Sequence, residues 1–137
     1  MSMVGPWARG YFHWFSEYLP RLEGVEHSRA ETGQNPTLLV PTDPPAWMTD
    51  SLHSLGYGPD AYVEWGGGRV TVERLVVPSV RRAWSDGGSS GYTNSTRGYR
   101  WVRETVLSDL DVDRSKRGNE RIFISRATTA ERRIVNE

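Results

Sequence analysis

The stretch "TLLVPTDPPAWMTDSLHSLGYGPDAYVEW", residues 37–65, decides the fold of this chain. It begins with a short, continuously apolar run, residues 37–42, which is typical of a strand buried on both faces. Two prolines then lead into a helical pattern that ends at Gly56 and Gly58, because proline favours the first turn of a helix and glycine its end. "AYVEW", residues 61–65, predicts a second strand. A strand, a helix and a strand in this order predict a parallel pair.

The segments on either side extend this pattern. "YFHWFSEYLPRLEGVEHS", residues 11–28, has apolar residues every three to four positions, which predicts a helix that Pro20 kinks or splits. No obvious strand leads into this helix. "VTVERLVVPS", residues 70–79, alternates and then becomes continuously apolar, which predicts a third strand.

The second half of the chain adds a loop, a helix and a strand. Residues 85–96 are rich in glycine and serine and predict a loop, which we expect to be mobile over residues 86–93. "NSTRGYRWVRETVLSDL", residues 94–110, predicts a helix with Asn94, Ser95 or Thr96 as its N-cap. The residues expected to form its buried stripe are Tyr99, Val102, Val106 and Leu110.

"RIFIS", residues 121–125, predicts a final strand. The predicted order is therefore helix, strand, helix, strand, strand, loop, helix, strand. Strands that alternate with helices in this way favour an α/β fold, with a mostly parallel sheet covered by helices.

Composition narrows the classes of function. The 137 residues suffice for one domain, or for one domain and a piece of another. The 17 basic and 17 acidic residues balance, so no net charge favours nucleic acid as a partner. With no cysteine and three histidines, the chain offers little material for a metal site. No apolar run reaches transmembrane length and no signal peptide is visible, so we expect a cytoplasmic protein without a transmembrane segment.

The end of the chain carries the first candidate site. In open α/β sheets, ligands bind beyond the carboxyl ends of the strands. Arg126 directly follows the last predicted strand, and Arg133 and Asn136 come shortly after it. A guanidinium offers planar, paired donors that suit phosphate oxygens. By residue type alone, the ordinary reading of this segment as solvated surface is favoured.

Several motifs, in order, resemble the glycosyltransferase family 61 proteins of the capsular polysaccharide biosynthesis type. The ending "RIFISRATTAERRIVNE" is similar to their Ile-Ser-Arg signature, with Arg126, Arg133, Asn136 and Glu137 at the matching positions. "YFHWFSEYLPRL" resembles their first helix, and "LLVPTDPPAWMTDSLHSLGYG" and "VERLVVPS" resemble the segments that follow. The resemblance covers nearly the whole chain.

This resemblance implies a particular fold. Residues 1–119 would be the N-terminal, acceptor-side domain of a GT-B fold, a Rossmann-like three-layer half with helices on both faces of a mostly parallel sheet. Residues 120–137 would supply the first strand and loop of the C-terminal, donor-binding domain, whose remainder is missing here. The final strand, residues 121–125, would then lack its normal neighbours, and an exposed strand edge favours self-association.

The resemblance also implies a reaction. A nucleotide-diphosphate sugar would donate its sugar, with inversion, to a hydroxyl of a glycan acceptor during polysaccharide or cell-surface glycan biosynthesis. The fragment by itself would bind no cofactor and would be incomplete. Arg126 and Arg133 would neutralise the leaving diphosphate without a metal, because both carry permanent charge. Asn136 and Glu137 would hold the loop or contact the donor.

His13 and Glu17 are the candidate catalytic residues. They are four residues apart and therefore share one face of the predicted helix. Histidine is the residue type that most often serves as a general base near neutral pH. The competing reading places His13 in an aromatic core with a single hydrogen bond, and only the family resemblance brings the two readings about level.

A second class of function stays open on sequence alone. The chain could be a non-catalytic α/β module that binds or assembles with another chain through an apolar face. A role for its arginines in nucleic-acid binding ranks well behind, since acidic residues equal the basic ones in number.

Overall fold

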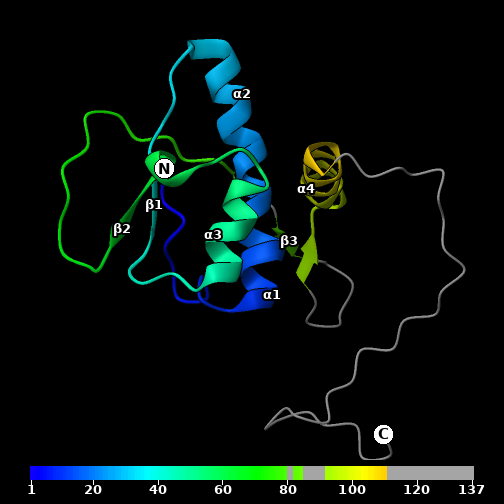
Figure 1. The fold of residues 1–137 in the computed structure, drawn as a ribbon, viewed down its shortest axis with the longest axis horizontal. Coiled ribbons are helices and arrows are strands. Elements are labelled where there is room, and N and C mark those ends of the chain that lie inside the picture. The colour runs from blue at the N-terminus through cyan, green and yellow to red at the C-terminus, as the bar shows by residue number, and fades with distance from the viewer. Residues whose placement is uncertain (80–81, 85–91, 111–137) are drawn as a thin grey trace, which may run out of the picture.

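The computed structural model describes residues 1–79, 82–84 and 92–110 (Figure 1). The elements in chain order are α1 (Tyr11–His13), the π-helical turn η1 (Trp14–Tyr18), the 3-10 turn η2 (Leu19–Arg21), α2 (Leu22–Thr32), β1 (Leu38–Pro41), α3 (Ala46–His53), the 3-10 turn η3 (Pro59–Ala61), β2 (Tyr62–Trp65), β3 (Arg82–Trp84), β4 (Tyr92–Asn94) and α4 (Thr96–Asp109).

The strand–helix–strand prediction for residues 37–65 is confirmed. β1 pairs with β2 in parallel, in a register that runs from Leu38 opposite Tyr62 to Pro41 opposite Trp65. α3 connects the two strands and begins directly after Pro45. Gly56 follows the helix with a φ of 83°, a left-handed conformation that glycine adopts without a steric cost.

The parallel sheet has a further segment that the sequence did not reveal. Residues 1–3 run parallel to β1 through a bridge between Ser2 and Leu39. The Leu39 amide donates to the Met1 carbonyl and the Met3 amide donates to the Leu39 carbonyl, each at 2.8 Å. Three residues are too few to show a strand period, and the structure has an isolated bridge here rather than a full strand before the first helix.

Pro20 splits the first helical region, as the sequence predicts. Residues 11–32 form four consecutive pieces, and Pro20 lies in η2, between the π-helical turn and α2. Proline lacks the amide hydrogen that a continuous α-helix needs, so the hydrogen-bond pattern changes there. The π-helical turn stacks Trp14 on Tyr18, with ring centroids 5.9 Å apart, and buries both.

The core lies between the parallel sheet and the helices. Its most deeply buried side chains are Met3, Trp14, Leu19, Leu22, Val25, Leu38, Val40, Met48 and Leu52. The indole of Trp14 donates to Ser51 Oγ at 2.8 Å, and Ser51 in turn donates to the Met48 carbonyl at 2.7 Å. A buried tryptophan therefore keeps its N–H paired, which avoids the cost of an unsatisfied donor.

α4 confirms one of the three predicted N-caps, because Ser95 Oγ accepts from the Gly98 amide at 3.1 Å. The predicted buried stripe is only half right. Val102 and Val106 are partly buried, whereas Tyr99 and Leu110 are exposed. α4 packs on η2 through Gly98, where a Cβ would lie 2.8 Å from Pro20 Cβ.

Two other predictions were wrong. Residues 70–79 form no strand, and Val70, Val72, Leu75 and Val77 are exposed, because within the described residues nothing pairs with this segment. Tyr92–Asn94, predicted as loop, forms β4 and pairs antiparallel with β3. Both errors have the same physical origin, because a strand forms only where a partner strand completes its hydrogen bonds.

The mixed α/β class is confirmed. Residues 85–91, most of the predicted mobile loop, and the predicted strand at 121–125 lie outside the described residues. Among the described helices, none combines the length and apolar character that crossing a membrane requires.

Candidate functional site

One edge of the parallel sheet gathers the loops that follow its strands. Residues 1–3, β1 and β2 all run in the same direction, so the chain leaves them at the same edge, through residues 4–10, 42–45 and 66–69. Figure 1 shows α1 and α3 starting together at the lower end of the view, while α2 extends to the opposite end. Ligands of open α/β sheets bind at this carboxyl edge.

His13 and Glu17 form a close pair beside this edge. His13 Nδ1 lies 2.7 Å from Glu17 Oε1, one helical turn away. The side chain of His13 is 30% exposed and that of Glu17 is 9% exposed. The expectation that the two share a helix face is confirmed. When Nδ1 carries the hydrogen and donates to the carboxylate, Nε2 carries a lone pair that can accept a proton.

Two aromatic rings bracket the imidazole. Trp7 stacks on it with centroids 5.5 Å apart, and Phe12 meets it edge-on at 5.4 Å. Gly10 leaves room for it, since a Cβ there would lie 3.3 Å from His13 Cδ2. No hydrogen-bond partner of Nε2 lies among the described residues. The aromatic surroundings expected by the competing reading are present, but they leave the ring open to solvent on one side.

Arg21 supports the carboxylate end of the pair. Its Nε donates to the backbone carbonyl of Glu17 at 3.0 Å, and its guanidinium lies 4.4 Å above the ring of Tyr18. Burial raises the pKa of the Tyr18 hydroxyl above its ordinary value, so this neighbour stays uncharged near neutral pH. Glu17 thus keeps a fixed position in a largely buried setting.

A pocket of about 370 Å³ opens at the same edge, between residues 4–9, 41–42 and 65–67. Arg9 joins two of its walls, because it donates to the carbonyls of Thr42 at 2.6 Å and Asp43 at 3.0 Å. The indole nitrogen of Trp65 is buried and has no hydrogen-bond partner among the described residues. Gly66 allows the close approach of Thr42, whose Oγ1 would lie 2.9 Å from a Cβ there.

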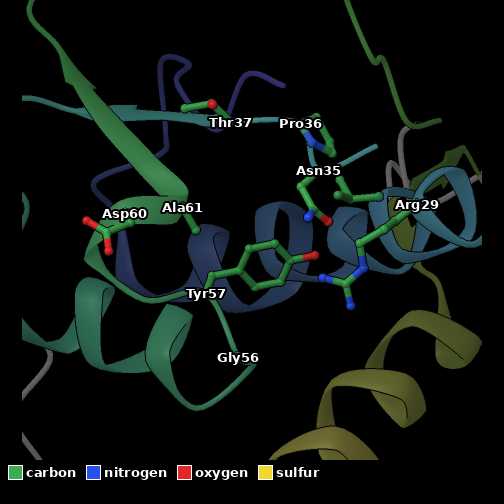
Figure 2. Close-up of a pocket in the computed structure, with 9 residues that line it drawn as sticks. Arg29, Asn35, Pro36, Thr37, Gly56, Tyr57, Asp60 and Ala61 are labelled. Carbon is green, nitrogen blue, oxygen red and sulfur yellow. The ribbon is translucent and has the colours of Figure 1, made fainter. Parts of the chain in front are cut away.

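The opposite edge of the sheet carries a second pocket, of about 320 Å³ (Figure 2). Figure 2 shows the Tyr57 ring across its centre, with Arg29 on one side and Asp60 on the other. The Tyr57 hydroxyl donates to Glu26 Oε1 at 2.5 Å, and Arg29 forms an ion pair with the same glutamate. Burial, reinforced by Glu26, raises the pKa of Tyr57 far above its ordinary value.

The other predicted site residues, Arg126, Arg133, Asn136 and Glu137, lie outside the described residues. In the part of the chain that the structure describes, no three acidic or histidine side chains cluster in a way that could hold a metal ion. The site geometry therefore rests on the His13–Glu17 pair and the pocket that holds Arg9 and Trp65.

A family model described as glycosyltransferase 61 matches residues 11–137. The chain belongs to the glycosyltransferase 61 family. The match begins where α1 begins, and it includes the His13–Glu17 pair as well as the arginine-rich ending. Family membership assigns sugar transfer as the class of activity. No curated protein and no solved structure matches the chain significantly.

Sequence reasoning missed Trp7, Arg9 and Trp65 in this glycosyltransferase. Trp7 and Arg9 lie in the loop that follows the unrecognised segment at residues 1–3. Trp65 is the last residue of β2 and precedes three glycines, a position at the carboxyl edge that could have drawn attention to it. Only the position of these residues at the carboxyl edge of the sheet could have indicated them, because neither a tryptophan nor an arginine has a diagnostic spacing by itself.

Proposed function

We propose that this chain is the acceptor-side part of an inverting glycosyltransferase in which His13 is the general base. The donor is a nucleotide-diphosphate sugar and the acceptor is a hydroxyl of a glycan. The observation that carries the proposal is the 2.7 Å contact between His13 Nδ1 and Glu17 at the carboxyl edge of the sheet. That contact orients the imidazole and leaves Nε2 for proton transfer.

The reaction follows from this arrangement. The acceptor hydroxyl gives its proton to His13 Nε2 while its oxygen attacks the anomeric carbon of the donor. The bond between that carbon and the diphosphate breaks on the opposite face, so the configuration inverts and the electron pair leaves with the nucleoside diphosphate. Glu17 stabilises the imidazolium that forms, because its carboxylate accepts the Nδ1 hydrogen.

The donor side of the proposal rests on the arginine-rich ending. Arg126 and Arg133 neutralise the charge that develops on the diphosphate, a role that permanent cations fill without a metal. Asn136 and Glu137 hold the surrounding loop or contact the donor. In this proposal, residues 1–119 form the acceptor-side half of a GT-B fold, and residues 120–137 begin the donor-side half.

Two features support a larger assembly around the described domain. The parallel sheet has only two full strands in the described residues. The segment around it exposes four apolar side chains, Val70, Val72, Leu75 and Val77. Exposed apolar surface of this kind favours contact with more protein, whether a second half-domain or another copy. The roles in polysaccharide or cell-surface glycan synthesis are proposed on the family resemblance, and the cytoplasmic location stays a prediction from the sequence.

Acceptor sugars need partners for their hydroxyls, and the pocket between Arg9 and Trp65 supplies them. The Trp65 indole nitrogen is a buried donor that has no acceptor in the part of the chain that the structure describes. Arg9 uses two of its five N–H groups on backbone carbonyls. The loop at residues 4–10 lines this pocket and also carries Trp7, which stacks on His13. We therefore assign the pocket to the acceptor sugar next to the reacting hydroxyl.

The chain contains a matched control for the base. His27 and Glu31 also lie four residues apart and 3.2 Å from each other, but they are 75% and 64% exposed. In the full-length enzyme, His13→Ala should lower kcat by roughly 10²–10⁴-fold, the usual contribution of a general base. His27→Ala should leave it unchanged. Similar rates for the two variants, with intact folding by circular dichroism, would favour a non-catalytic module instead.

The donor side is tested separately. A charge-assisted contact to phosphate is worth on the order of 1.5–3 kcal/mol, so Arg126→Ala should weaken use of the nucleotide sugar by roughly one to two orders of magnitude. Arg132 lies outside the matched spacing and serves as the control. Equal kcat/KM values for Arg126→Ala and Arg132→Ala would show that these arginines are ordinary surface residues with no role in donor binding.

A further inference from the structure

An aromatic groove of about 420 Å³ lies between the α1–η1 region and α4. Tyr11, Phe12 and Phe15 line one wall, and Tyr99 and Val102 line the other. Tyr11 and Phe12 are 62% and 64% exposed. A contiguous exposed apolar patch on a folded protein is a candidate binding surface.

The contact between Gly98 and Pro20 fixes the position of one wall of the groove. A Cβ at position 98 would lie 2.8 Å from Pro20 Cβ, so α4 approaches η2 as closely as a glycine permits. The helix is anchored at this point, and its neighbouring turn, with Tyr99 and Val102, faces the α1 aromatics across the groove. The two walls therefore belong to rigid elements.

The lining chemistry selects the ligand. Besides the phenolic hydroxyls of Tyr11 and Tyr99, the groove is lined by only two side chains with polar groups, Ser16 and Arg103. Ser16 is 4% exposed, and its Oγ has no hydrogen-bond partner among the described residues. Arg103 forms an ion pair with Glu104 at 2.9 Å. Against such walls, a sugar ring would leave most of its hydroxyls without hydrogen-bond partners. A hydrocarbon has no hydrogen bonds to lose and gains free energy from burial there.

The groove adjoins the proposed base. Phe12 lines the groove and also meets the His13 ring edge-on at 5.4 Å. The acceptor pocket is lined by the loop that also carries Trp7, which stacks on His13. A ligand in the groove is therefore separated from the proposed base by one aromatic ring, that of Phe12. We propose that the groove binds an apolar hydrocarbon aglycone attached to the acceptor sugar, an inference that rests on the proposed function.

The first test is direct binding of n-alkyl glycosides of one sugar, from methyl to octyl, to the protein without donor, measured by isothermal titration calorimetry. Each methylene that enters the groove should tighten binding by up to roughly fourfold, since a buried methylene contributes about 0.8 kcal/mol. The length series should level off once the groove is full. Equal affinities for the methyl and octyl glycosides would overturn the proposal.

Variants locate the effect. Phe12→Ala and Tyr99→Ala should flatten the dependence on chain length, while Leu75→Ala, an exposed apolar residue outside the groove, should preserve it. Ser16→Ala should preserve or strengthen chain binding, because it removes an unpartnered hydroxyl from an apolar wall. A weaker complex with Ser16→Ala, together with tight binding of an oligosaccharide that has no alkyl chain, would make the groove a sugar subsite and overturn the proposal.

Two further arms separate this inference from the proposed function. His13→Ala should lose transfer activity but keep the chain-length dependence of binding. The proposed base and the proposed hydrocarbon site can therefore fail independently of each other. 1-Octanol should bind at least tenfold more weakly than the octyl glycoside, because it lacks the sugar that the Arg9–Trp65 pocket holds. Equal binding of 1-octanol would show a general lipid site and overturn the link to the acceptor.

Discussion

The two edges of the parallel sheet use similar groups in different ways. At the amino edge, the Tyr57 hydroxyl donates to Glu26, and Arg29 neutralises the same carboxylate (Figure 2). At the carboxyl edge, His13 contacts Glu17 through Nδ1. Each edge therefore places a ring donor against a glutamate. The amino-edge network holds its phenolic proton firmly, whereas the His13 ring keeps a second nitrogen without a partner in the described residues.

This difference separates a structural network from a chemical one. A buried phenol with a strongly raised pKa neither gives up nor accepts a proton near neutral pH. An imidazole oriented through one nitrogen can exchange a proton through the other. The pockets at the two edges have similar volumes, about 320 and 370 Å³, so cavity size does not identify the chemistry. What identifies the chemistry is the second ring nitrogen of His13, which has no partner in the described residues and can transfer a proton.

The sharpest test of the comparison neutralises the two glutamates in turn. Glu17→Gln should lower kcat of the full-length enzyme by roughly 100-fold, because the imidazolium loses its carboxylate partner. Glu26→Gln should leave kcat unchanged and lower the unfolding free energy instead. Steady-state kinetics and chemical denaturation distinguish the two results. A loss of activity in both variants would mean that the amino edge also takes part in catalysis.

A smaller effect is expected when a methyl group is added to a glycine at each edge. A Cβ at Gly5 would lie 2.2 Å from the Tyr18 hydroxyl, whereas a Cβ at Gly58 meets nothing within 4 Å. Gly5→Ala should lower the unfolding free energy by about 2 kcal/mol, as overpacking does. Gly58→Ala should change it by less than about 0.5 kcal/mol. Comparable urea midpoints would show that Tyr18 moves aside without cost.

The smallest effect concerns pH. The folded state keeps the Tyr57 proton above pH ~10, where an ordinary tyrosine in the unfolded chain loses it, so stability falls as the pH rises through that range. Tyr57→Phe should cost about 1 kcal/mol at pH 7, where it loses the bond to Glu26. Above pH 10 its stability should fall less steeply than that of the wild type. Parallel stability curves between pH 7 and 11 would contradict this.

The sequence by itself determined the local features. The strand–helix–strand unit at residues 37–65 and the break at Pro20 were predicted, and Ser95 was one of three predicted caps, because each feature depends on neighbouring residues in the chain. The His13–Glu17 contact was predictable for the same reason, since a four-residue spacing places two side chains on one helix face. Such features need no knowledge of what packs against them.

Only the tertiary structure decided the features that depend on a distant partner. Residues 70–79 have a strand-like pattern and form no strand, while residues 1–3 have no visible pattern and join the sheet. Tyr57 and Glu26 are 31 residues apart, and Arg9 reaches a carbonyl 33 residues away. The physical reason is that a strand pairing or a convergent site takes its free energy from groups that the fold brings together, and local periodicity carries no information about those groups.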